Sequence, residues 1–136
     1  MCYYVDSQIT KKDLKKMYNV GYEGKDFEAK DFLNGYSHPW VAVILDENPA
    51  VATAANWGLL PAWAKDRSLQ KQTLNAKIET IAEKPSFRNN VQKRCLVLVK
   101  GFYEWKWLDG KGKVKQKHFL ALPDTPIMAL GGIYGN

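Results

Sequence analysis

Cys2 is the residue whose type and position best suit covalent chemistry. Methionine aminopeptidases commonly remove Met1 when residue two is small, and the mature chain then begins with an α-amine beside a thiol. The ordinary pKa values of these groups, about 8 and about 8.5, make both available as nucleophiles near neutral pH. An aldehyde would form a Schiff base with the amine, and the thiol would then close a thiazolidine ring on the same carbon. The alternative is an ordinary buried cysteine near a terminus.

Two polar residues far along the chain could support such chemistry. Asn75 carries an amide that both donates and accepts hydrogen bonds, which suits the orientation of an amine, although an asparagine at this place could also cap a helix. Glu104 stands between Tyr103 and Trp105 in an expected strand. Partial desolvation there would favour general acid–base catalysis, and the alternative is an outward-facing carboxylate paired with Lys106 or another lysine.

Basic and aromatic residues in the middle of the chain suit contacts with nucleic acid. Lys77 and Arg88 could bind phosphate, and Trp63, in an irregular stretch, could stack on an unpaired base. For Trp57 we expect packing in the core instead of stacking on a base. The formal net charge is +6, and residues 57–120 hold 14 Lys and Arg against 5 Asp and Glu. Such a segment could meet a polyanion, and the alternative is a solubilising lysine surface.

Several other classes of protein are disfavoured. The two cysteines and two histidines, Cys2, Cys95, His38 and His118, lack the spacing of a zinc site, so we expect no metal and no cofactor. No apolar run approaches the ~20 residues of a membrane span, and the first residues do not resemble a signal peptide. We therefore expect a cytoplasmic protein, associated with the nucleoid if it binds DNA.

The hydrophobic pattern predicts one mainly β domain over residues 1–136, with short helices. A helix is expected over 11–19 with Thr10 as its N-cap, and a short second helix over 78–83. Apolar runs and turn residues predict strands over 41–45, 50–57, 94–99, 101–107, 117–122 and 127–134, with a hairpin turn at 109–112. Many short strands with few helices indicate a barrel-like domain.

Taken together, these groups resemble the SOS response-associated peptidase (SRAP) family. The matches are Met-Cys at 1–2, W-G-L-x-P-x-W at 57–63, N-A-x-x-E-T at 75–80, E-K-P-x-F-R at 83–88, R-C-L-V at 94–97, G-F-Y-E-W-K at 101–106 and an apolar strand at 127–134. The resemblance spans essentially the whole chain. No single match is specific, but the combination in this order is.

The resemblance implies an α+β, mainly β fold: a partly open β-barrel with short peripheral helices and a positively charged DNA groove. It implies that Cys2, freed of the initiator methionine, crosslinks covalently to abasic sites in single-stranded DNA and shields them during the DNA damage response. Asn75 would hold the amine and Glu104 would handle protons. Lys77 would contact phosphate and Trp63 would support splayed bases. The family is also described as having peptidase activity, tied to removal of its own N-terminal residue.

The sequence departs from the family pattern in three places. Family members usually have glycine and arginine after the cysteine, where Tyr3 and Tyr4 stand here. Lys77 stands where the family commonly has an arginine, so the positive charge is kept but the planar guanidinium, which can donate two parallel hydrogen bonds, is absent. A catalytic histidine belongs to a later motif, which neither His38 nor His118 matches. We therefore expect a chain that lacks the C-terminal part of the fold, with an open sheet edge that invites a homodimer.

Three functions stay open on the sequence alone. The first is an enzyme-like DNA crosslinker of the SRAP type, and the second is a non-catalytic module that binds single-stranded DNA. The third, an autoproteolytic cysteine peptidase, ranks lowest because no histidine matches a base for the thiol. In a chain that keeps Met1, the Cys2 nitrogen is an amide, so we expect no thiazolidine from that form.

Overall fold

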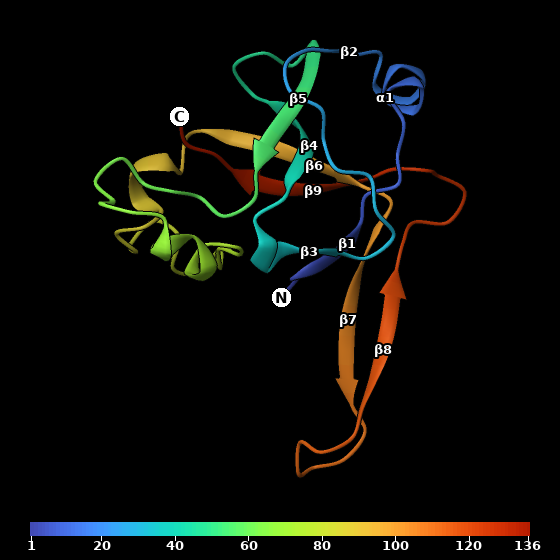
Figure 1. Cartoon of the computed structure of the whole chain (residues 1–136), viewed down its shortest axis with the longest axis vertical. Coiled ribbons are helices and arrows are strands. Elements are labelled where there is room, and N and C mark those ends of the chain that lie inside the picture. Colours follow the sequence, from blue (N-terminus) through green and yellow to red (C-terminus); the bar gives the residue numbers. More distant parts are fainter.

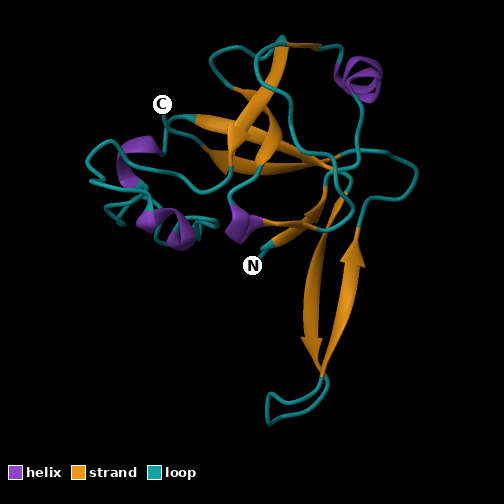
Figure 2. Ribbon diagram, in the orientation of Figure 1, coloured by secondary structure: helices purple, strands orange, loops and turns teal.

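Two sheets form the framework of this computed structural model, which describes all 136 residues (Figure 1, Figure 2). The four-stranded sheet has the order β3-β1-β7-β8, with β1 (Tyr4–Asp6), β3 (Leu33–Asn34), β7 (Gly101–Trp107) and β8 (Lys115–Leu120). The five-stranded sheet has the order β2-β5-β4-β6-β9, with β2 (Gly21–Tyr22), β4 (Trp40–Leu45), β5 (Val51–Asn56), β6 (Arg94–Val99) and β9 (Met128–Ile133). Every strand pair is antiparallel except β2–β5. The expected mainly β fold is confirmed, and the two sheets do not close into a barrel.

The helix α1 (Lys11–Tyr18) begins where the sequence predicts. The Thr10 side chain accepts from the backbone N–H of Asp13, and the Asp13 carboxylate accepts from the backbone N–H of Thr10, which forms a capping box. Asn19 ends the helix in the left-handed region, and Leu14 is fully buried against the five-stranded sheet. None of the helices has the length and apolar character that a membrane span requires.

The second helix, expected over 78–83, is absent, and that prediction was wrong. Residues 78–83 form consecutive turns instead. The backbone N–H of Thr80 bonds to the carbonyl of Lys77, and that of Glu83 bonds to the carbonyl of Thr80. Both bonds span three residues, so an α-helix does not propagate. The remaining helical segments are short 3₁₀ turns, η1 (Gly35–Ser37), η2 (Ser68–Gln72) and η3 (Arg88–Asn90).

Alternation along the central strands divides the core between the two faces of the five-stranded sheet. Ala42 and Ile44 of β4 belong to a cluster beneath α1, whereas Val41 and Val43 belong to a second cluster that includes residues of the four-stranded sheet. Successive side chains of a strand point to opposite faces, so one strand contributes to both clusters. The second cluster includes partly buried Cys2, which fixes the start of the chain between the sheets.

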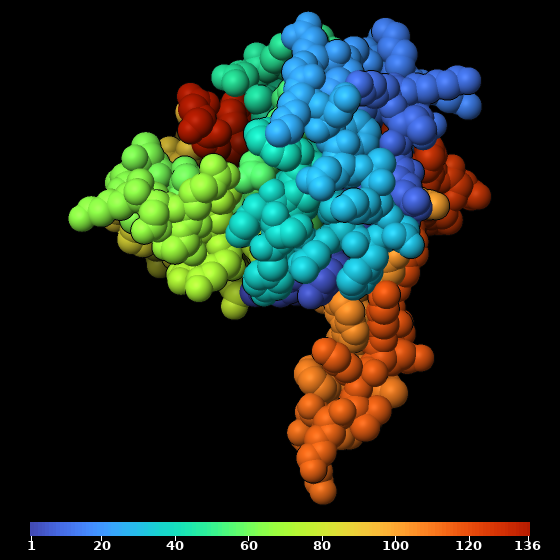
Figure 3. All heavy atoms as spheres, in the orientation of Figure 1, coloured from blue at the N-terminus to red at the C-terminus, as the bar shows by residue number.

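Two parts of the chain extend beyond this framework. The β7–β8 hairpin runs away from the body as an arm at the bottom of the view, and segment 57–93 packs at the left side of the body with little regular structure (Figure 1, Figure 3). At the edge of the five-stranded sheet, β9 pairs only with β6.

Candidate active site

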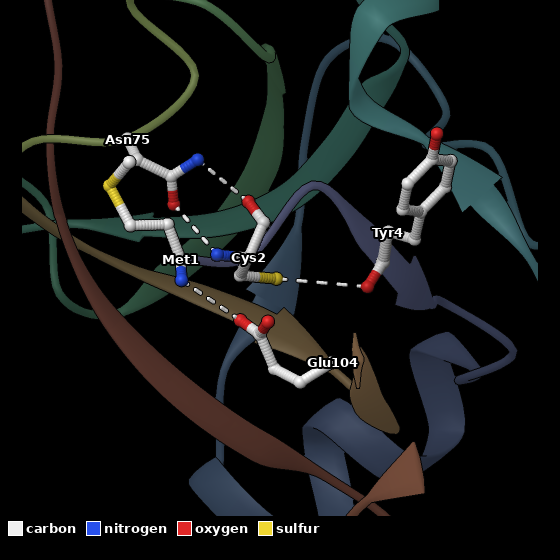
Figure 4. A network of polar contacts seen from close by, with 5 residues as sticks. All are labelled: Met1, Cys2, Tyr4, Asn75 and Glu104. Carbon is white, nitrogen blue, oxygen red and sulfur yellow. Dashed lines mark hydrogen bonds and ion pairs between the residues drawn. The ribbon is translucent and has the colours of Figure 1, made fainter. Parts of the chain in front are cut away.

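The start of the chain is tied to the loop that contains Asn75 by two hydrogen bonds (Figure 4). The backbone N–H of Cys2 donates to Asn75 Oδ1 at 3.1 Å, and Asn75 Nδ2 donates to the carbonyl oxygen of Cys2 at 2.8 Å. A single amide thus satisfies both backbone groups of Cys2 across 73 positions of sequence. The arrangement uses both capacities of the asparagine and fixes the direction of the Cys2 nitrogen.

Neighbouring contacts hold the Asn75 loop in place. The indole N–H of Trp57 donates to the carbonyl of Leu74 at 2.8 Å, and Thr73 Oγ1 donates to the carbonyl of Leu59 at 2.6 Å. Leu74 and Thr73 are themselves buried. The stretch around Trp57 therefore anchors the residues immediately before Asn75, and Trp57 packs against the core as its sequence context favours.

Glu104 lies on the other side of the chain terminus. Strand β1 pairs with β7, with Tyr4 opposite Tyr103, so the residues before Tyr4 run alongside Glu104. The Met1 α-ammonium lies 3.2 Å from Glu104 Oε1 (Figure 4). The carboxylate is thus paired with the amino terminus and not with a lysine. Both groups are partly exposed, so we assign this pair at most about 1 kcal/mol of stability.

The thiol of Cys2 is protonated at neutral pH. Burial raises the pKa of this thiol to about 11, and the nearby Glu104 carboxylate adds to the increase. Its Sγ lies 3.7 Å from the carbonyl oxygen of Tyr4, which accepts from the S–H. Cys2 in this form is a neutral thiol held between an amide and a carboxylate.

A cavity of ≈ 1100 Å³ lies next to this group. Its walls are mostly apolar and come from the five-stranded sheet and from segment 57–91, and Cys2 and Asn75 are among its lining residues. Glu104 lines a separate hollow of ≈ 280 Å³ together with His118. Cys2 therefore has an open space on one side and a carboxylate on the other.

The structure brings Cys2, Asn75 and Glu104 together, and the other three predicted site residues make no hydrogen bond or ion pair with them. Trp63, Lys77 and Arg88 are exposed on segment 57–91, and none of them bonds to Cys2. Trp63 keeps half of its surface in solvent, with its indole N–H 3.4 Å from the carbonyl of Pro85. These three side chains are available to a ligand that crosses this part of the surface.

Sequence reasoning missed a polar network that supports the same loop. Gln70 is 3% exposed, and its Nε2 donates to the carbonyl of Gly58 and to Asn56 Oδ1. Arg67 donates to both Gln70 and Asn56. Gly58 has a φ of +109°, a conformation that favours glycine. Gly58 was the only sign of this network in the sequence. It indicates a turn, but it does not indicate which side chains bond to that turn.

Comparison with known proteins identifies the family of this chain. The family model described as SOS response associated peptidase (SRAP) matches residues 1–136. The chain belongs to this family. Its site combines residues from three of the matched motifs, at Cys2, Asn75 and Glu104.

Relatives of known name and structure extend the comparison. "Abasic site processing protein YoaM" of Bacillus subtilis is 40% identical over 95 residues, 69% of this chain and 41% of the relative. "Abasic site processing protein HMCES" of Mus musculus is 36% identical over 92 residues, 64% of this chain and 26% of the relative. The crystal structure of a Bacteroides thetaiotaomicron protein superposes with a TM-score of 0.83 at 27% identity, over 97% of this chain and 59% of that one. The chain thus spans less than half the length of these curated relatives.

Proposed function

We propose that this chain carries the reactive centre of an abasic-site processing protein. After loss of Met1, Cys2 crosslinks to the ring-opened sugar of an abasic site in single-stranded DNA and so shields the lesion during the DNA damage response. The observation that carries the proposal is the placement of Asn75 on the Cys2 nitrogen with Glu104 beside the terminus. The names of the relatives support the substrate class.

The steps follow from the chemistry of an amine, a thiol and an aldehyde. The Cys2 amine adds to the sugar C1′ carbonyl to give a carbinolamine, which loses one water to become an imine. The thiol sulfur then bonds to the imine carbon, and the thiol proton passes to nitrogen. The product is a thiazolidine, and the balance of the reaction is the release of one water. Because both nucleophiles belong to one residue, ring closure is intramolecular.

Each neighbouring residue has a role that matches its contacts. Asn75 Oδ1 accepts an N–H from the Cys2 nitrogen and so directs the nitrogen lone pair. Glu104 would give a proton to the departing hydroxyl and take one from the amine. Its carboxylate lies 3.2 Å from the Met1 α-ammonium and acts on the Cys2 thiol, so it is near the Cys2 nitrogen that becomes the terminus when Met1 is lost. Burial and Glu104 raise the pKa of the thiol, to about 11 in the chain that carries Met1, so the thiol enters the reaction protonated and brings the proton that the imine nitrogen receives.

The DNA strand would run across segment 57–91. Lys77 and Arg88 would neutralise phosphates there, and Trp63 would stack on an unpaired base. All three side chains are exposed, and Lys77 lies two residues from Asn75. An abasic site in such a strand would reach Cys2 through the open space beside Asn75. A protein with this role would act at the nucleoid.

Two other functions have less support. A cysteine peptidase would need a thiolate at Cys2, but burial and Glu104 hold the pKa of the thiol near 11. A module that only binds single-stranded DNA leaves the Cys2–Asn75 pair and the Glu104 contact without a use. The covalent function accounts for all three residues.

An open sheet edge supports a further proposal, that two copies pair through β9. This strand bonds to β6 on one side only, and unpaired edges invite another strand. Light scattering across a range of protein concentrations tests it. A mass that rises to that of a dimer is expected, and a monomer at every concentration would oppose it.

The test of the proposed function uses abasic single-stranded DNA and a denaturing gel. Processed protein is expected to give a shifted band that survives denaturation, and Cys2→Ala is expected to give none. Cys95→Ala is the matched control, because Cys95 is a buried cysteine on β6 and should not affect the band. A shifted band that persists in Cys2→Ala would remove Cys2 from the mechanism. Binding without any covalent band would favour the binding module.

A further inference from the structure

One face of the β7–β8 hairpin carries aromatic rings and lysines in alternation. We call it the aromatic–lysine face. It consists of Tyr103, Trp105, Trp107, Lys115 and Lys117 of the hairpin, together with Phe32, which precedes β3 and packs against Tyr103 and Trp105. Strand register places Lys117 opposite Trp105 and Lys115 opposite Trp107. The same register puts Glu104 on the other face of β7, because neighbouring residues of a strand point in opposite directions.

The ammonium groups lie over the rings. Lys117 Nζ is 4.2 Å from the ring centroid of Phe32 and 4.6 Å from that of Tyr103. Lys115 Nζ is 5.4 Å from the ring of Trp105 and 5.7 Å from that of Trp107. These are cation–π distances, at which the ring face attracts a positive charge. Each lysine therefore bridges two rings and leaves its charge at the surface.

This face is accessible to a large partner. Every residue of β8 is exposed, and the Trp107 side chain is 55% exposed. The hairpin projects from the body, so solvent surrounds its outer part (Figure 3). Residues 101–120 hold five lysines against two acidic residues, a net positive charge. A partner that matches the face must present both flat apolar surfaces and negative charge.

We propose that the aromatic–lysine face binds a stretch of single-stranded DNA outside the reactive centre. Bases would stack on the ring faces, above all that of Trp107, as Lys115 and Lys117 move off the rings to contact phosphates. This inference rests on the proposed function for its choice of DNA, but it does not need the covalent step. It gives the hairpin arm a task that Cys2, Asn75 and Glu104 do not perform.

The spacing of the rings selects an unpaired strand. Alternate residues of an antiparallel strand are about 6.8 Å apart, which separates Tyr103 from Trp105 and Trp105 from Trp107. Stacked bases in a duplex rise about 3.4 Å per strand step and present only their edges. A duplex cannot lay base faces on these rings, whereas an extended single strand can. Stacking of this kind tolerates any base sequence.

Binding of an undamaged, fluorescently labelled single-stranded oligonucleotide tests this inference by anisotropy. The lesion-free strand separates it from the proposed function, since no crosslink forms. Trp107→Ala is expected to weaken binding about tenfold, as loss of one stacked base does, and Trp107→Phe to restore most of it. Lys115→Gln with Lys117→Gln is expected to lower the slope of log K against log salt by about 1.4, for two lost phosphate contacts.

Lys111→Gln with Lys113→Gln is the matched control. These lysines lie in the turn of the same hairpin, and neither lies over a ring. Their replacement removes the same two charges as the replacement of Lys115 and Lys117. A smaller change in slope is expected from this pair. Equal slopes for the two lysine pairs, unchanged affinity in Trp107→Ala, or duplex binding as tight as single-strand binding would each overturn the inference. Failure of the intact chain to bind the oligonucleotide at all would also overturn it, whatever the result of the crosslinking assay.

Discussion

Replacing Asn75 with aspartate isolates the electrostatic part of the proposed chemistry. In Asn75→Asp the side chain keeps its shape, but an oxygen replaces the Nδ2 that donates to the carbonyl of Cys2 at 2.8 Å. The other oxygen stays about where Oδ1 accepts from the Cys2 nitrogen, 3.1 Å away in the wild type. In the processed chain that nitrogen is an α-amine, so a carboxylate would stand beside a group that must lose its proton to react.

The size of the effect follows from this distance. An opposite charge within about 4–6 Å favours the charged form of a group by roughly 1–3 pKa units. Cys2 is only half-buried, so we expect the lower end, a rise of about one unit in the pKa of the amine. The ordinary value is about 8, and below it one unit reduces the fraction of free amine about tenfold. The crosslinking rate at pH 7 should fall by a similar factor and recover towards pH 10.

The assay is the rate of crosslink formation with abasic single-stranded DNA, measured from pH 6 to pH 10. Asn75→Ala is the control, because it loses both hydrogen bonds without adding charge. Its rate should fall at every pH with an unchanged midpoint, and it should lose roughly 1–3 kcal/mol of unfolding free energy in urea. If Asn75→Asp shows the wild-type midpoint, Asn75 does not contact the reacting amine and the assigned role is wrong.

Three further predictions address the thiol, the loop and the core. Glu104→Gln removes a negative charge that raises the pKa of the Cys2 thiol, so alkylation by iodoacetamide at pH 8–9 should be faster than in the wild type, and an equal or slower rate would contradict the assigned electrostatics. Gly58→Ala places a Cβ 2.9 Å from the carbonyl oxygen of Gln70 at a φ of +109°, so urea unfolding should show a loss of about 1–3 kcal/mol, and no loss would mean that the turn adapts. Leu98→Ala removes a fully buried side chain and should cost about 2–5 kcal/mol, measured in the same way, whereas a cost under 1 kcal/mol would place Leu98 outside the core.

Local patterns in the sequence located most of the regular elements. The helix with its Thr10 cap, the adjacent strands predicted over 41–45 and 50–57 and the hairpin around 109–112 each depend on neighbouring residues, so their signals are local. The strand β8 was predicted two residues late, over 117–122 in place of 115–120. Both faces of the hairpin are exposed, so the strand begins with two polar residues, Lys115 and Gln116, which give no apolar signal. The strands β1, β2 and β3 were missed, because segments of two or three residues show no period.

The site itself depended on contacts that no local pattern reveals. Asn75 lies 73 positions from Cys2, and Glu104 joins them because β1 pairs with β7. Only the resemblance to a family linked these residues before the structure did. The contact between Met1 and Glu104 was not expected, since sequence reasoning considered a lysine as the partner. The buried Gln70 network was missed because a glutamine in a polar stretch carries no sign of its burial.

The most direct test of the central claim is the mass and thiol content of the product that processed protein forms with abasic single-stranded DNA. We expect the sum of the two masses less one water, resistance to borohydride reduction, and one free thiol after denaturation, that of Cys95. Two free thiols in an adduct that borohydride reduces would show a Schiff base without ring closure. An adduct that also keeps only one free thiol and forms equally well from a chain that retains Met1, at the summed mass of that chain and the DNA less one water, would contradict the role of the Cys2 amine.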